Sequence, residues 1–283
     1  MARSERATKP RQPSDESPLT GEDVANMLGA MPPGMVLVGG QALAFWIAYY
    51  GIKPGAKAEI TSDGDVLGTL DEARLLARRL GGKLRVPPAR ALTSLVAQVR
   101  LPLPSSGLER NIDVLHKLYD LGGLRKSTHF THRAIARARV VEIESGVRFQ
   151  VLHPLDLLAS RVNNAAGLLD AKGRHVLTQV RWAIKVMQEA LLGAAALGEP
   201  VRLGAMVQEV HRLAKAAAGC ALFKLHDIEV FDAVPIKALV RLRPELKEQC
   251  ARMVLAMVAR RKLDVLAREN RTKSPSRQGG KSG

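Results

Sequence analysis

The chain has 283 residues and a mass of 30.6 kDa, and 46% of its residues are hydrophobic, which is enough for one large or two moderate domains with proper cores. Its formal net charge is +16, a balance that attracts polyanions such as nucleic acid or nucleotides but also fits a solvated, arginine-rich surface. Cys220 and Cys250 are its only cysteines. This number argues against a disulfide framework and fits a reducing cytosol.

The first eighteen residues include Pro10, Pro13 and Pro18 and few apolar side chains, so we expect a disordered arm over residues 1–18. The arm has no apolar segment of the signal-peptide type. Residues 20–23 then have the pattern of a capping box that begins a short helix.

Residues 35–38, Met-Val-Leu-Val, form a short aliphatic run that predicts a buried strand. Gly39 and Gly40 follow, and residues 41–48 suit a buried helix. The uncharged run from Met35 to Ile52 is nearly as long as a membrane span, but the glycines and Gln41 divide it into strand and helix. We therefore expect a cytoplasmic protein that does not contact a membrane.

The glycine pair between this strand and helix can act as a phosphate cradle. Glycine has no Cβ, so a phosphate can approach the backbone, and the first turn of a helix offers unpaired N–H groups. Gln41 and Ser62 are candidates for additional hydrogen bonds to a nucleotide triphosphate. The alternative is a plain turn, which glycine pairs form in many proteins.

Three carboxylates form a candidate metal site. Asp63 and Asp65 are two positions apart, so in a strand both side chains point to one face. Asp113 lies between Ile112 and Val114, in a second predicted strand. A hard divalent cation, with magnesium the natural candidate, would relieve the repulsion between such carboxylates. The alternative for residues 61–65 is ordinary turn or capping chemistry.

The remaining elements follow in two groups. A second capping box at Thr69 begins a helix that extends through Leu80 and ends at a glycine pair. Strands are predicted over residues 83–86, 95–101, 111–115, 138–143 and 147–152, and helices over 155–166, 171–197, 203–218 and 244–268. We expect an α+β fold: a mixed sheet flanked by helices over residues 19–153, a helical domain over 154–269, and a disordered basic tail over 270–283.

Val38-Gly39-Gly40, the Asp63-Gly64-Asp65 pattern and Asp113 together resemble the signature of the DNA polymerase beta-like nucleotidyltransferase superfamily. Residues 152–164, with Lys172 and residues 179–184, resemble the helical part of abortive-infection toxin-type nucleotidyltransferases. The similarity covers roughly residues 20–195. Gly64 departs from the pattern, because the family usually has an apolar residue between the two acids.

The resemblance implies a two-domain enzyme that closes over a magnesium nucleotide and transfers NMP from an NTP to RNA, protein or a small molecule. Asp63, Asp65 and Asp113 would hold two magnesium ions, and a glycine pair would open the helix beside the nucleotide. Arg161 and Lys172, in the helical segment, would neutralise triphosphate charge, and Asn164 would bind the nucleotide beside them; the alternative is that these are solvated surface residues. An antitoxin protein as a partner rests on the resemblance alone. The alternative is an inactive protein of this fold that binds nucleic acid, with RNA attracted by the basic tails.

Overall fold

The structure is a computed structural model that describes residues 17–53, 63–103, 108–198 and 200–273. It divides into two compact units, Met1–Val186 and Met187–Gly283, here called unit 1 and unit 2. The first helices after residue 154 therefore belong to the same unit as the sheet. No helix in the described part of the chain is both long and apolar enough to cross a membrane.

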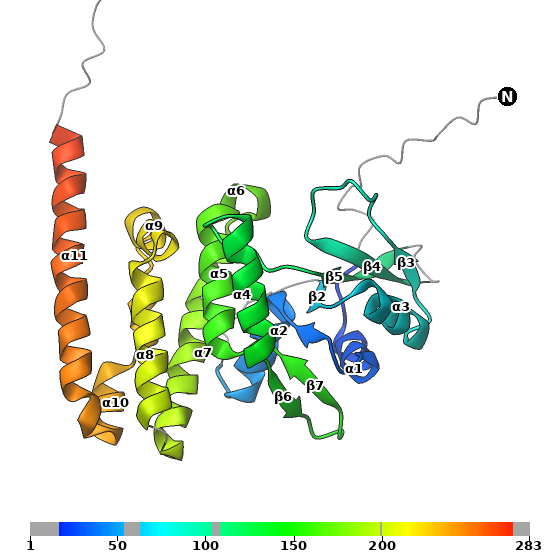
Figure 1. Cartoon of the computed structure of the whole chain (residues 1–283), viewed down its shortest axis with the longest axis horizontal. Helices are drawn as coiled ribbons and strands as arrows, with labels where there is room; N and C mark the ends of the chain where they lie inside the picture. Colours follow the sequence, from blue (N-terminus) through cyan, green and yellow to red (C-terminus); the bar gives the residue numbers. More distant parts are fainter. Residues whose placement is uncertain (1–16, 54–62, 104–107, 199, 274–283) are drawn as a thin grey trace, which may run out of the picture. The chain divides into compact units, whose positions relative to one another are not determined.

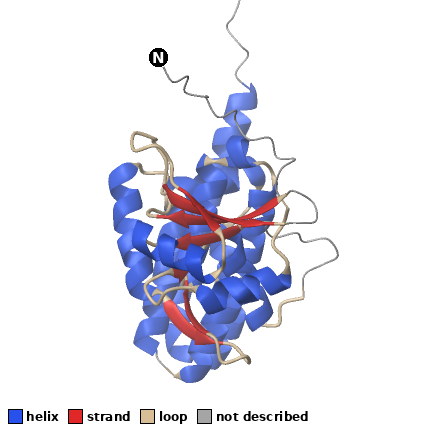
Figure 2. Ribbon diagram, turned by 90° about the vertical axis from the view of Figure 1, so that its right-hand side faces the viewer, coloured by secondary structure: helices blue, strands red, loops and turns tan. Residues whose placement is uncertain are grey.

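Unit 1 contains a seven-stranded mixed sheet with the strand order β3-β4-β5-β2-β1-β7-β6. Its strands are β1 (Val36–Leu37), β2 (Gly64–Leu67), β3 (Lys83–Arg85), β4 (Leu95–Pro102), β5 (Glu109–Leu115), β6 (Arg139–Glu142) and β7 (Arg148–Val151). The pairs β2–β5 and β1–β7 are parallel, and the other four pairs are antiparallel. Figure 2 shows the strands in red, changing direction across the sheet as twisted strands do.

Helices flank this sheet. They are α1 (Gly21–Ala30), α2 (Gly39–Tyr49), α3 (Leu70–Arg79), α4 (Leu124–Arg137), α5 (Pro154–Gly167), α6 (Leu169–Lys172) and α7 (His175–Leu197), which continues into unit 2. Each of the five predicted strands after Leu80 is present within two residues of its predicted ends. The predicted mixed sheet flanked by helices is confirmed, and the protein is of the mixed α/β class.

Unit 2 is helical in its described residues. It contains α8 (Pro200–Lys215), α9 (Ala217–His226), α10 (Ile236–Leu242) and α11 (Lys247–Lys273), with short 3-10 turns before and after α10. Figure 1 shows α11 as a long red helix, with α10 beside its first turns. The two cysteines, on α9 and α11, are free thiols. Helix α11 continues into the predicted tail as far as Lys273, and residues 274–283 lie outside the described part, as do residues 1–16 of the predicted arm.

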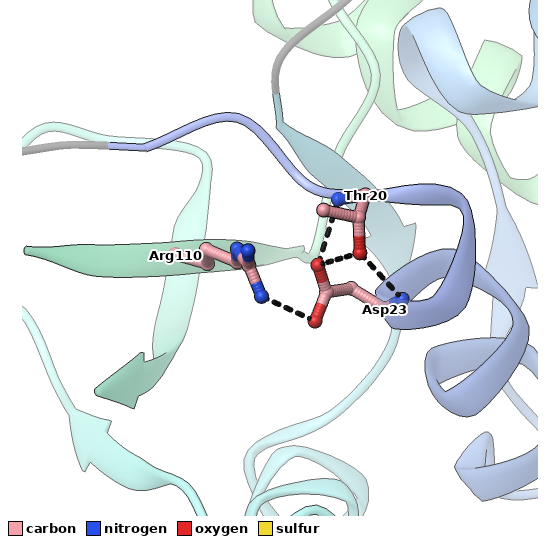
Figure 3. A network of polar contacts seen from close by, with 3 residues as sticks. All are labelled: Thr20, Asp23 and Arg110. Atoms are coloured by element: carbon pink, nitrogen blue, oxygen red, sulfur yellow. Dashed lines mark hydrogen bonds and ion pairs between the residues drawn. The ribbon is translucent and has the colours of Figure 1, made fainter. Parts of the chain in front are cut away.

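Both predicted capping boxes are present, at Thr20 on α1 and Thr69 on α3. The first is also tied to the sheet. The Asp23 carboxylate accepts hydrogen bonds from the Thr20 N–H and hydroxyl, and Arg110 of β5 donates to its other oxygen at 2.8 Å (Figure 3). Burial alone would raise the pKa of Asp23, but these hydrogen bonds and the Arg110 charge outweigh it and lower the pKa. The N-terminus of α1 is thereby fixed against β5.

Helix α5 is the centre of unit 1, because every residue from Pro154 to Ala165 is buried. Several of its polar side chains form hydrogen bonds inside the fold, as buried polar groups require. Asp156 receives a hydrogen bond from Arg133 at 3.1 Å, and Asn163 accepts one from the Leu121 N–H and donates one to the Ala159 carbonyl. The segment that resembles the toxin-type family is thus the most deeply packed helix of the unit.

Several helices differ from the predictions. Helix α4 was not predicted, because its Ser, Thr and His residues are poor helix formers; Phe130 and Ala134 are buried in the structure, and packing overrides propensity. The helix predicted over residues 171–197 is divided at Gly173, whose φ of +87° ends α6. The helix predicted over 203–218 is likewise interrupted at Ala216, and α9 and α10 were also missed.

Candidate active site

The three candidate acids lie close together on the β2–β5 pair, near the start of β2. In this parallel pair Asp65 is directly opposite Asp113, so their side chains share a face of the sheet. Asp63 immediately precedes β2. The aspartates also interact electrostatically, since Asp113 and Asp63 both raise the pKa of Asp65. The structure therefore brings the three predicted acids together.

Asp65 also lies against the glycine pair. Because β1 and β2 are antiparallel, the end of β1 faces the start of β2, and the Val38 N–H donates to the Asp65 carbonyl at 2.9 Å. Gly39 has a φ of +67°, and a Cβ there would lie only 2.0 Å from the Asp65 carboxylate. Glycine at position 39 thus makes room for a carboxylate, where the sequence predicted room for a phosphate.

Gly40 and Gln41 form the first turn of α2 with Gly39, and the N-cap residue Val38 makes no side-chain capping hydrogen bond. The first turn of an uncapped helix has N–H groups without intrahelical partners and a partial positive charge. This end of α2 is therefore chemically suited to an anion, and Asp65 is the anion closest to Gly39 in the structure.

Gly64, the departure from the family pattern, has a packing reason. A Cβ at this position would lie 2.9 Å from the Met27 sulfur and 3.1 Å from Leu19. Helix α1 covers this point of β2 so closely that an apolar side chain between the two acids would not fit without rearrangement. Glycine at position 64 avoids this collision, so Asp63 and Asp65 keep their positions on either side of it.

Two predicted cations act on the acids. Arg161 of α5 and Lys172 of α6 both lower the pKa of Asp65, Arg161 more strongly. Burial nevertheless dominates and raises the pKa of Asp65 to about 6, from its ordinary 3.8. Burial in turn lowers the pKa of Arg161, which Asp65 partly opposes. The site is therefore a desolvated acid compensated by cations from the helical segment.

Arg161 is held by partners that sequence reasoning missed. Its guanidinium donates to Gln179 of α7 at 3.0 Å and to the Ser160 hydroxyl at 3.3 Å. Its Nε is buried and has no hydrogen-bond partner among the described residues, and Arg161 forms no direct ion pair with Asp65 there. These two hydrogen bonds fix the guanidinium in place.

Gln98 is a further residue that the sequence did not single out. It lies opposite Asp113 in the antiparallel β4–β5 pair, and its amide donates to the Asp113 carboxylate at 2.9 Å. Only the register of β4 against β5 reveals this contact. Gln98 therefore orients one oxygen of the third acid.

The structure gives less support to the other predicted site residues. Gln41 and Asn164 are buried, but within the described residues neither side chain hydrogen-bonds to an acid of the site. Lys172 is exposed at the end of α6, and Ser62 lies outside the described residues. In the described part of the chain, no three His, Cys, Asp or Glu side chains already surround one point as metal ligands. The aspartates are neighbours without forming a closed coordination cage.

Comparison with known proteins identifies no family. A scan against protein-family models gives no match, and a search of curated protein sequences gives no significant match. The site is therefore defined by its own geometry: a mixed α/β unit with adjacent acids on two parallel strands, a glycine turn beside them, and two cations from following helices.

Proposed function

We propose that unit 1 is a magnesium-dependent nucleotidyltransferase domain that transfers NMP from an NTP to an acceptor hydroxyl. The observation that carries the proposal is the direct opposition of Asp65 and Asp113 on β2 and β5, with Asp63 next to them. Adjacent carboxylates repel each other, and this cost is recovered when a hard cation binds between them. Their position beside Gly39 adds the start of a helix, where phosphate binds favourably.

The donor set fits magnesium, which prefers carboxylate oxygens and retains several waters. Asp63, Asp65 and Asp113 would hold the ions, and two are expected from the resemblance. Bound magnesium would neutralise phosphate charge and make the acceptor hydroxyl more acidic. The protein side chains would position the nucleotide and the acceptor around the magnesium.

Arg161 has the clearest role toward the phosphates. Gln179 and Ser160 fix its guanidinium, so its positive charge is held near Asp65 and would attract the phosphates. A fixed donor stabilises the charge that develops during transfer without reorganisation. Lys172, which is exposed, would add a mobile positive charge. The start of α2 would add its partial positive charge, with the Asp65 carboxylate occupying the space beside Gly39.

The test is transfer of label from each α-labelled NTP, with magnesium, to a total RNA and protein extract. Label in one fraction would identify the acceptor class. Asp113→Asn should abolish transfer and keep the fold, because the amide preserves the shape but loses the charge that binds the cation. Glu144→Gln, at an exposed position between β6 and β7, is the matched control and should transfer normally.

Unchanged transfer by Asp113→Asn would refute the assignment of the site. Absence of both transfer and saturable magnesium binding in the wild-type protein would instead favour an inactive fold that binds nucleic acid. The further suggestion that the enzyme is a toxin controlled by an antitoxin rests on the resemblance alone. Co-purification of the chain with a protein that suppresses transfer would support it.

A further inference from the structure

Unit 2 contains a groove of about 520 Å³ between α8 and α11. Its α8 side is a single helical stripe, because residues 208, 211, 212 and 215 are spaced three and four apart. The lining side chains are Gln208, His211, Arg212 and Lys215 on α8, and Gln249 and Arg252 on α11, with Met253 beside them. Among the described residues, no acidic side chain lines this groove.

The cations of the groove are largely uncompensated. Arg212 and Lys215 are exposed, and neither forms an ion pair with any described residue. Arg252 has one exposed carboxylate, Glu248, at 3.8 Å, which is a weak pair. Cations held side by side without acids repel each other, and an anion bound between them would relieve this repulsion.

Two neutral side chains complete the lining of the groove. Gln249 donates to the Gly204 carbonyl of α8 at 3.0 Å, which fixes α11 against α8 at this point. His211 packs edge-on against Phe231 with the ring centres 5.5 Å apart, and its buried Nε2 has no hydrogen-bond partner among the described residues. The pKa of His211 is lowered by burial and by Lys215, so the neutral imidazole is favoured.

We propose that the α8–α11 groove binds the phosphate backbone of a nucleic-acid strand. Exposed Arg and Lys side chains bind successive phosphates, and the exposed Gln208 amide suits a hydrogen bond to phosphate or sugar. The groove is open and lies along two helices, which suits a chain that passes through it better than an enclosed small molecule. The proposal does not depend on the transferase reaction, since all of these residues belong to unit 2.

The test uses the full-length protein and a fluorescent, unstructured single-stranded oligonucleotide, in buffer with EDTA so that the aspartates hold no metal. The variant Arg212→Gln/Arg252→Gln removes two groove cations. The matched control Lys237→Gln/Arg241→Gln removes two exposed cations of α10 that do not line the groove. Affinity is measured at several salt concentrations.

Each phosphate contact on a single strand contributes about 0.7 to the slope of log affinity against log salt, so the groove variant should lose roughly 1.4 and the control much less. Equal losses in both variants would overturn the proposal, because they would show diffuse attraction to the whole surface. In wild-type protein, the oligonucleotide should shift the ring resonances of His211. Pyrophosphate is the competing ligand. If pyrophosphate shifts the His211 resonances and the oligonucleotide does not displace it, the groove binds a small polyphosphate and the proposal is overturned.

Discussion

Asp65 and Asp113 are directly opposite each other on two adjacent parallel strands, so two carboxylates share one face of the sheet, and burial disfavours the charged form of Asp65. This arrangement costs free energy in the protein without a bound cation. The same cost makes the site measurable by stability and titration, independently of any enzymatic assay.

The pH dependence of stability should report on Asp65. Its folded-state pKa of about 6 is above its ordinary 3.8, so folding disfavours the charged form. The wild-type protein should therefore lose stability as the pH rises from about 4 through 6. Asp65→Asn should be more stable than wild type above that range, by on the order of 1–3 kcal/mol, and the difference should shrink below pH 4.

Denaturant unfolding in EDTA between pH 4 and 8 measures this difference. Glu144→Gln, which removes an exposed carboxylate, provides the baseline. A constant difference between Asp65→Asn and wild type across the range would show that Asp65 does not titrate as described.

Replacing the charged neighbours of Asp65 should change its pKa, and the structure predicts the direction and relative size of each change. Arg161→Met should raise the Asp65 pKa most, because Arg161 is the strongest opposing charge, and Lys172→Met should raise it less. Asp113→Asn should lower it, since a like charge is removed. Carboxyl carbon NMR follows each titration. A larger effect from Lys172 than from Arg161 would place the lysine, and not the buried arginine, next to the acid.

Gly39→Ala should be strongly destabilising for two separable reasons. The left-handed backbone at φ +67° costs a non-glycine residue about 1–2 kcal/mol, and the new Cβ would collide with the Asp65 carboxylate. Gly51→Ala is a matched control, because Gly51 has a φ of +62° and open space around it. Chemical unfolding should show a cost at least about 1 kcal/mol greater at position 39.

The excess cost at Gly39 should largely disappear when Asp65 is replaced by glycine, since the collision is then removed. If the two alanine variants cost the same, the carboxylate moves away without penalty, and Gly39 is needed only for its backbone conformation.

The Asp23–Arg110 contact should contribute to stability above the ordinary pKa of aspartate. Because the Asp23 pKa is lowered in the folded protein, this stabilisation should be lost as the pH falls through the folded-state value. A double-mutant cycle with Asp23→Asn and Arg110→Met should give a coupling free energy of about 1 kcal/mol at pH 7. Repeating the cycle at a pH below the folded-state pKa of Asp23, where the carboxylate is protonated, should give almost none.

Local sequence determined most of the elements of unit 1. The alternation of apolar residues, the glycine turn after β1 and the two capping boxes act over a few residues, so β1 to β7, α2 and α3 could be predicted from short stretches. The sequence also singled out Asp63, Asp65 and Asp113 as candidates, and the family resemblance added Arg161 and Lys172. The structure brings these residues near one another.

Only the tertiary structure decided what depends on register and packing. The pairing of β4 with β5 places Gln98 on Asp113, and the packing of α5 and α7 places Gln179 on Arg161. Helix α4 forms despite its weak propensity because Phe130 and Ala134 are buried, and the side chain that occupies the space above Gly39 belongs to Asp65. These contacts join residues far apart in the chain, and the free energy that selects them comes from burial across the whole unit, which no local pattern contains.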